Sequence, residues 1–176
     1  MGVMKNIFLI GMMGAGKTET GKCLAKKLGL IFVDLDSEIE QEARMTVSGI
    51  FGTHGEPFFR DLEKGVLKRI VNRNSQVIAT GGGIVLDPAN RLLMKESGTV
   101  VYLRASVRVL FERLKEKKDR PLLNRPDPEE ALARIFQDRR SLYESCHDGA
   151  VDTEGKTPRE VAEALIAKLG LKQGAA

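Results

Sequence analysis

Short runs of apolar and β-branched residues alternate along the chain with longer segments whose apolar residues recur every three or four positions. The short runs predict strands, and the longer segments predict amphipathic helices. Strands that alternate with helices predict βαβ units, so we expect an α/β fold of three layers, with helices on both faces of a parallel five-stranded sheet. The expected strands are residues 6–11, 30–36, 76–80, 99–105 and 149–153, and the expected helices are residues 17–29, 56–72, 106–117, 127–145 and 157–170.

Capping residues support several of the expected helix ends. Gly29 and Gly170 stand where a helix commonly ends on a glycine, and Ser106 is a favourable N-cap. Asp127 precedes a proline at the first position of its helix, where proline is tolerated. These boundaries therefore rest on local chemistry as well as on periodicity.

Two segments depart from the alternation. Residues 37–60 contain three glycines that would interrupt a helix, and residues 115–127 are highly charged and contain two prolines. Ligands of such folds bind at the carboxyl ends of the strands, and we expect both segments to be mobile inserts on that side. The glycines are Gly49, Gly52 and Gly55.

Bulk properties narrow the class of protein. A chain of 176 residues, 42% hydrophobic and 30% charged, suits one globular domain. No apolar run reaches the roughly 18 residues of a membrane span, and the two cysteines have no metal-ligand spacing. The net charge of +4 comes without a recognisable nucleic-acid module and with 5% aromatic residues. We therefore expect a cytoplasmic protein that binds neither membrane nor nucleic acid.

The segment GMMGAGKT, residues 11–18, matches the phosphate-binding pattern G-x-x-x-x-G-K-[ST] between an expected strand and an expected helix. Backbone N–H groups and the helix N-terminus would cradle phosphates, Lys17 would reach the β- and γ-phosphates, and Thr18 would offer its hydroxyl to Mg²⁺. No N-K-x-D motif is present, so a GTPase is disfavoured and a small kinase that uses ATP is expected. We assign the nucleotide site to Gly14, Ala15, Gly16, Lys17, Thr18 and Glu19.

Candidates for the acceptor site follow the second expected strand. Asp34 and Asp36 are two residues apart, so on a strand their side chains would point to the same side and could serve a magnesium ion and a hydroxyl nucleophile. Alternatively, the pair forms a turn in which Asp36 caps the helix that follows. Three arginines from separate segments could bind anionic groups, since the guanidinium suits carboxylate and phosphate. They are Arg60, Arg120 and Arg139.

Three consecutive glycines follow the third expected strand in the segment ATGGG, residues 79–83. Each glycine costs more ordering entropy on folding than any other residue would. Gly81, Gly82 and Gly83 are therefore either a loose turn or a place where a ligand approaches bare backbone. The residues alone leave both interpretations open.

Taken together and in this order, the segments GMMGAGKT, VDLD, EPFFR–LE, ATGGG, RPLL and RR-SLY resemble shikimate kinase, and the resemblance runs from about residue 5 to residue 168. It implies a nucleoside-monophosphate-kinase-like fold in one domain, residues 1–176, with a substrate-binding insert at about 35–63 and a lid at about 115–127. It implies transfer of the ATP γ-phosphate to the 3-hydroxyl of shikimate by a monomer.

The resemblance also implies roles for single residues. Asp36 would hold the shikimate hydroxyls and orient or deprotonate the nucleophile, and Asp34 would help Thr18 to hold Mg²⁺. The glycines would lie against the substrate ring. The remaining implied contacts are Arg60 and Arg139 (in preference to Arg140) with the substrate carboxylate, Arg120 with the transferring phosphate, and Arg113 and Pro158 with the adenine.

Three other functions remain as alternatives. A gluconate kinase would share the phosphate loop and the lid, but would not need this combination of aspartates, arginine and glycines. A nucleotide-binding regulatory module would not need a complete transfer apparatus. A basic RNA-binding protein would show a steep dependence of its affinity on salt.

Overall fold

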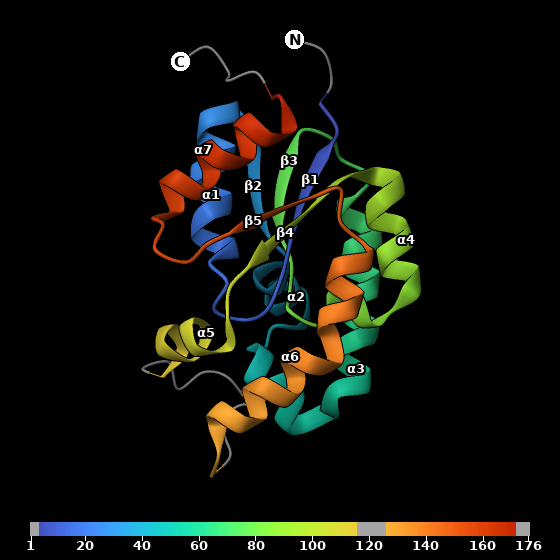
Figure 1. Ribbon diagram of the computed structural model, residues 1–176. Helices are drawn as coiled ribbons and strands as arrows, with labels where there is room; N and C mark the ends of the chain where they lie inside the picture. The colour runs from blue at the N-terminus through green and yellow to red at the C-terminus, as the bar shows by residue number, and fades with distance from the viewer. Residues whose placement is uncertain (1–3, 116–125, 172–176) are drawn as a thin grey trace.

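The computed structural model describes residues 4–115 and 126–171, and it confirms the expected α/β architecture (Figure 1). Five strands form one sheet in the order β2-β3-β1-β4-β5, and every neighbouring pair is parallel. The strands are β1 (Asn6–Ile10), β2 (Ile31–Asp34), β3 (Gln76–Ala79), β4 (Gly98–Arg104) and β5 (Gly149–Asp152).

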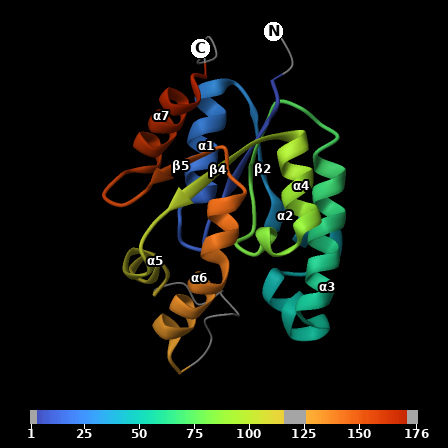
Figure 2. The ribbon, with the colours of Figure 1, turned by 45° about the vertical axis from the view of Figure 1, so that its right-hand side comes forward.

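Helices cover both faces of this sheet. Helices α1 and α7 pack against each other on one face, and α3 and α4 lie on the other, with α6 beside them (Figures 1 and 2). The helices are α1 (Lys17–Leu28), α2 (Leu35–Ala43), α3 (Val47–Ile70), α4 (Pro88–Ser97), α5 (Val107–Leu114), α6 (Pro128–Ser145) and α7 (Pro158–Leu169), and the short 3₁₀ helix is η1 (Ile84–Leu86).

The core lies between the sheet and the two helix layers. All residues of β1 and β3 are buried, as expected for central strands of a parallel sheet that is covered on both faces. The polar member of β1, Asn6, is fully buried and satisfied, because it accepts from the backbone and side chain of Gln76 and donates to the carbonyl of Arg73. None of the helices in the described ranges has the length and apolar character needed to cross a bilayer.

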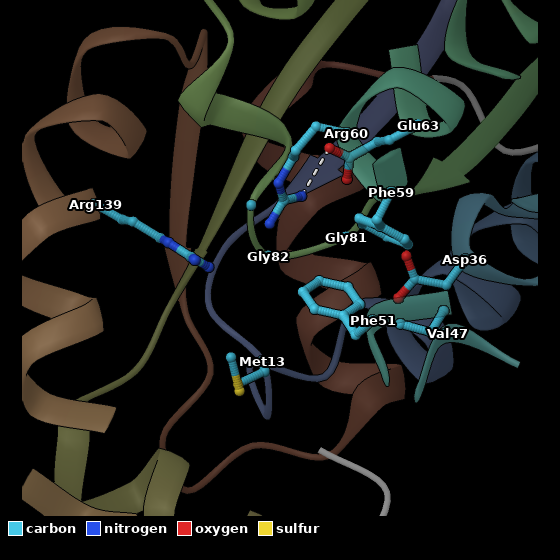
Figure 3. Close-up of a pocket in the computed structure, with 11 residues that line it drawn as sticks. Met13, Asp36, Val47, Phe51, Phe59, Arg60, Glu63, Gly81, Gly82 and Arg139 are labelled. Atoms are coloured by element: carbon cyan, nitrogen blue, oxygen red, sulfur yellow. Dashed lines mark hydrogen bonds and ion pairs between the residues drawn. The ribbon is translucent and has the colours of Figure 1, made fainter. Parts of the chain in front are cut away.

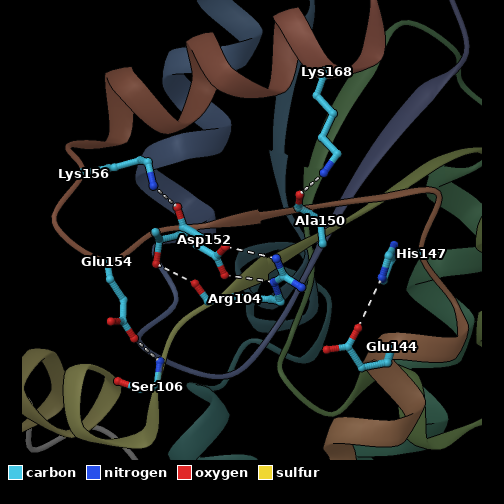
Figure 4. Close-up of polar contacts among 10 residues, drawn as sticks. Arg104, Ser106, Glu144, His147, Ala150, Asp152, Glu154, Lys156 and Lys168 are labelled. Carbon is cyan, nitrogen blue, oxygen red and sulfur yellow. Dashed lines mark hydrogen bonds and ion pairs between the residues drawn. The ribbon is translucent and has the colours of Figure 1, made fainter.

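Polar contacts fix the ends of β4 and β5 on the carboxyl side of the sheet (Figure 4). Arg104 donates from Nε and Nη2 to the two carboxylate oxygens of Asp152, both at 3.0 Å. Glu154 accepts from the backbone N–H of Ser106, at the start of α5. The loop that leads from β5 to α7 is therefore tied to neighbouring strand and helix ends.

The predicted helix caps are largely confirmed. Gly29 and Gly170 adopt left-handed conformations, with φ of 67° and 61°, and Ser106 accepts a hydrogen bond from Val109 N. Asp127 precedes α6 as expected but makes no side-chain capping bond. Helix α4 and η1 were not predicted, although Asp87 followed by Pro88 is the same signal as Asp127 followed by Pro128, and the Asp87 side chain caps α4 by accepting from Ala89 N.

The predicted second strand is too long. Strand β2 ends at Asp34, whose Oδ1 accepts from the backbone N–H of Ser37 at 3.4 Å and caps α2. Asp36 therefore belongs to the first turn of a helix, so the argument that both side chains share one side of a strand was wrong. The alternative cap assignment was also wrong in its residue, because Asp34 and not Asp36 is the N-cap.

The expected interruptions in residues 37–60 are mostly absent. Helix α3 passes through Gly49 and Gly52, and only Gly55 leaves the helical conformation, with φ of 81° and ψ of 174°. Gly55 therefore divides α3 into two parts, and Pro57 lies in the first turn of the second part, where its missing N–H has no helical acceptor to lose. The predicted lid, residues 115–127, lies mostly outside the described residues and stays a prediction.

Gly98 offers a test of the register between β1 and β4, where it pairs with Asn6. A Cβ at Gly98 would lie 2.2 Å from the backbone oxygen of Asn6, although its extended backbone suits any residue. We expect Gly98→Ala to lower the free energy of unfolding in urea by about 1–3 kcal/mol through overpacking. The control is Gly65→Ala in α3, where a Cβ would meet nothing within 4 Å. This change should raise the free energy of unfolding by about 0.5–1 kcal/mol, because alanine favours a helix more than glycine does. Equal effects of the two changes would contradict this account.

Candidate active site

Two pockets lie at the carboxyl ends of the central strands, and they share Met13, Asp36 and Gly82. The first contains the phosphate loop and is lined by Met13, Gly14, Gly16, Lys17, Thr18, Glu19, Asp34, Asp36, Thr80, Gly82 and Arg113. The second is drawn in Figure 3 and is lined by Met13, Asp36, Val47, Phe51, Phe59, Arg60, Glu63, Gly81, Gly82, Gly83 and Arg139. Groups bound in the two pockets would meet at the three shared residues.

The phosphate loop connects β1 to the N-terminus of α1. The two glycines that the pattern requires, Gly11 and Gly16, have positive φ values of 142° and 90°, and Gly14 at a variable position has φ of 82°. Lys17 is buried, and its Nζ donates to the carbonyls of Gly11 at 2.7 Å and Met12 at 2.9 Å. The ammonium group is thus held over the loop, where charge-neutralising contact with phosphate is possible.

The hydroxyl of Thr18 donates to Oδ2 of Asp34 at 2.8 Å. The predicted metal residues are therefore adjacent, although they come from α1 and from the end of β2. Within the described ranges, no group of three or more His, Cys, Asp or Glu side chains could hold a metal ion. A hydroxyl and one carboxylate fit Mg²⁺, which commonly takes most of its other ligands from water and nucleotide phosphates.

Arg113 joins the phosphate loop to the loop after β5. Its Nη1 donates to the carbonyl of Gly14 at 3.2 Å, and Nη1 and Nη2 donate to Thr153 at 3.0 and 2.9 Å. Pro158 begins α7 on an exposed surface and does not line the phosphate pocket. Glu19 is exposed at the pocket and pairs with Lys22.

Arg60 extends from the second part of α3 into the other pocket, where it is mostly buried. Its Nη1 donates to Glu63 at 2.8 Å, and its Nε and Nη2 both donate to Oε1 of Glu56, at 3.1 and 2.8 Å. The guanidinium carbon also lies 5.1 Å from the centre of the Phe59 ring, within the range of a cation–π contact.

Glu63 is a functional candidate that the sequence reasoning missed. Its side chain is 0% exposed, Oε2 binds Arg60, and Oε1 has no hydrogen-bond partner among the described residues. Burial raises the pKa of Glu63, although Arg60 opposes the rise and Asp36 adds to it. Its signal in the sequence was an acidic residue one helical turn after Arg60, in EPFFR–LE.

The three glycines leave space for these charged side chains. A Cβ at Gly81 would lie 2.9 Å from carboxylate oxygens of both Asp36 and Glu63, and one at Gly83 would lie 2.2 Å from Nη2 of Arg60. At Gly82 the nearest atom would be Met13 N of the phosphate loop, at 3.3 Å. The three glycines are therefore packed closely against neighbouring protein groups and do not form a loose turn, and the approach of a ligand to them stays a prediction.

Helix α6 supplies Arg139, which is buried and points into the pocket toward Arg60 in Figure 3. Arg140, its neighbour in the chain, lines a different hollow beside Tyr102 and Glu144. Of the two candidates, the structure thus places Arg139 in the acceptor pocket. Arg120 lies outside the described residues.

Tyr143 lies one helical turn after Arg139 and contacts the glycine segment, residues 81–83. Its hydroxyl donates to the carbonyl of Gly82, its ring stacks on Tyr102 with 5.1 Å between centres, and burial raises the pKa of its hydroxyl. A neutral, buried donor therefore holds the backbone that the two pockets share.

A phosphate loop at the end of β1, a Thr–Asp pair beside it and an adjoining pocket with two arginines define a P-loop phosphotransferase of small molecules. The family model for shikimate kinase matches residues 13–170. The shikimate kinase of Thermodesulfovibrio yellowstonii is 52% identical over 163 residues, which cover 93% of this chain and 94% of that protein. The chain belongs to the shikimate kinase family.

Two further comparisons agree with this assignment. The shikimate kinase of Persephonella marina is 40% identical over 166 residues, covering 94% of this chain and 99% of the relative. A solved structure of shikimate kinase from Acinetobacter baumannii, in complex with shikimate, has a TM-score of 0.91 and 38% identity, and the match covers 95% of this chain and 94% of that one.

Tyr143→Phe tests the support under the glycine segment. Loss of the hydroxyl leaves the Gly82 carbonyl without this donor, so the free energy of unfolding should fall by about 1–3 kcal/mol. Tyr102→Phe is the matched control, because in the described part of the chain the Tyr102 hydroxyl has no hydrogen bond and its change should be nearly neutral. Urea denaturation measures both, and equal losses would show that the Tyr143 hydroxyl has no special role.

Proposed function

We propose that the protein transfers the γ-phosphate of ATP to the 3-hydroxyl of shikimate and releases shikimate 3-phosphate and ADP. The observation that carries the proposal is the pair of pockets that share Asp36, one containing the phosphate loop and the other containing two arginines. Such a pair brings a nucleotide phosphate and an anionic acceptor into contact. Family membership and the shikimate complex of the Acinetobacter baumannii relative support the same acceptor.

In this proposal the phosphate loop binds and orients the nucleotide. The N–H groups at Gly14 and Gly16 and the N-terminus of α1 would bind the phosphates, and Lys17 would neutralise their charge. Ala15 closes the turn between them, because its N–H donates to the carbonyl of Met12 at 3.1 Å. Thr18 and Asp34 would hold Mg²⁺, which would offset the negative charge of the nucleotide phosphates. Arg113 and the loop before Pro158 would line the adenine.

The acceptor is held by charge and by backbone. Arg60 and Arg139 would bind the substrate carboxylate from two elements, α3 and α6, and Gly81–Gly83 would lie against the ring. Asp36 lies where the pockets meet, so it would orient the 3-hydroxyl toward the γ-phosphate and accept its proton. Arg120, from the lid, would meet the transferring phosphate.

The setting of the reaction is part of the proposal. Cys23 and Cys146 are both free thiols, which suits a reducing compartment, and ATP is available in the cytoplasm. We propose that the protein acts there as a monomer.

The direct test measures ADP release with ATP, Mg²⁺ and one of three hydroxy acids: shikimate, gluconate or quinate. We expect rapid turnover with shikimate and little with the other two. Lys17→Ala, with its fold checked by circular dichroism, should abolish the shikimate-dependent signal. Turnover with gluconate alone, or full turnover in the Lys17 variant, would contradict the proposed reaction.

A further inference from the structure

Arg60 is held by two carboxylates of different character. Glu63 is fully buried and belongs to the pocket wall, whereas the Glu56 side chain is 43% exposed and lies outside the pocket lining. Glu56 instead lines a neighbouring hollow that also contains Arg139. It therefore lies beside both arginines of the acceptor site without touching the acceptor space.

The contacts of Arg60 determine which of its donors remain for a ligand. A guanidinium has five N–H groups, one on Nε and two on each terminal nitrogen. Within the described residues, Glu56 takes the Nε group and one on Nη2, and Glu63 takes one on Nη1. One N–H group therefore remains on each of Nη1 and Nη2, the two nitrogens through which the end of a guanidinium can bind a carboxylate with paired hydrogen bonds.

The chain around Gly55 sets the position of Glu56. Gly55 breaks α3 with φ and ψ values that suit glycine, so Glu56 enters the first turn of the second part of the helix. An acidic side chain is favoured at that end of a helix, and Arg60 follows at the i+4 position where side chains meet. The contact is thus fixed by local geometry.

We propose that Glu56 is a positioning residue that fixes the guanidinium of Arg60 with its terminal N–H pair presented to the carboxylate of the acceptor. When the guanidinium is already oriented, ligand binding avoids the entropy cost of ordering a long side chain. The negative charge of Glu56 opposes an anionic ligand, so its useful feature here is the acceptor oxygen. This inference rests on the proposed function, because it needs an acceptor that carries a carboxylate.

The test compares Glu56→Ala, which removes the contact, with Glu56→Gln, which keeps an acceptor oxygen and removes the charge. Shikimate binding is measured by calorimetry without nucleotide, and kcat and KM by ADP release. We expect Glu56→Ala to raise the Kd and KM for shikimate by about 3- to 10-fold, the cost of ordering one long side chain. The kcat and the KM for ATP should stay within about twofold, and Glu56→Gln should bind shikimate at least as tightly as the parent.

Glu42→Ala is the matched control. Glu42 is 44% exposed and accepts a hydrogen bond at 2.9 Å from Arg69, which lies in α3 like Arg60. Glu42 lines neither pocket. Its shikimate Kd should equal that of the parent, and thermal unfolding should show that all variants are folded. If Glu56→Ala does not fold, Glu56→Asp takes its place, since it keeps the acidic first turn but shortens the reach to Arg60.

Several results would overturn the role of Glu56. An unchanged Kd in Glu56→Ala would show that Arg60 needs no support, and a lower Kd would show that Glu56 competes with the substrate. An equal rise of the shikimate Kd in Glu56→Ala and Glu56→Gln would mean that Glu56 acts through its charge and not by orienting Arg60. A parent protein that neither binds nor phosphorylates shikimate would instead reject the proposed function, which the calorimetry of the parent detects separately.

Discussion

The path of the backbone through Gly81–Gly83 is the constraint on which the site depends. At two of these glycines a Cβ would collide with carboxylates or with the guanidinium of Arg60, and at Gly82 it would press on the phosphate loop. The absence of side chains at these residues therefore leaves the space that the charged side chains occupy at the carboxyl edge of the sheet. Gly82 of the same segment lines both pockets, so one short stretch of main chain separates them.

Burial makes the charges near this segment interdependent. Glu63 is removed from water, and burial raises its pKa, but Arg60 stabilises its charged form. Breaking such a pair by removing one partner costs several times more than an exposed ion pair contributes, roughly 3–5 against 0–1 kcal/mol. Arg139 brings a second positive charge from α6. In the pocket lining, Glu63 and Asp36 balance Arg60 and Arg139, so the arginines offer directed donors to an anionic acceptor and not an excess of positive charge.

The sequence was sufficient for the sheet, the phosphate loop and most helix ends, because these follow from periodicity and from glycine and capping residues. The sequence was insufficient to place a residue that suits two structural positions equally well. Asp34 could end a strand or cap a helix, and it does both, which moves Asp36 onto α2. Glu63 resembled a surface residue of an amphipathic helix, since only tertiary packing shows that it is buried. Helix α4 was missed although its start signal, Asp87 followed by Pro88, is present in the sequence.

The central claim is that Arg60 binds a carboxylate of the substrate through paired donors. A double cycle tests it by combining Arg60→Lys with a shikimate analogue that lacks the carboxylate, and by measuring each Kd with calorimetry. Lysine keeps the charge but loses the fork, so Arg60→Lys should raise the Kd for shikimate by about 10- to 100-fold. With the analogue the same substitution should have almost no effect, so the two losses should not add. Fully additive losses would show that Arg60 does not contact the carboxylate.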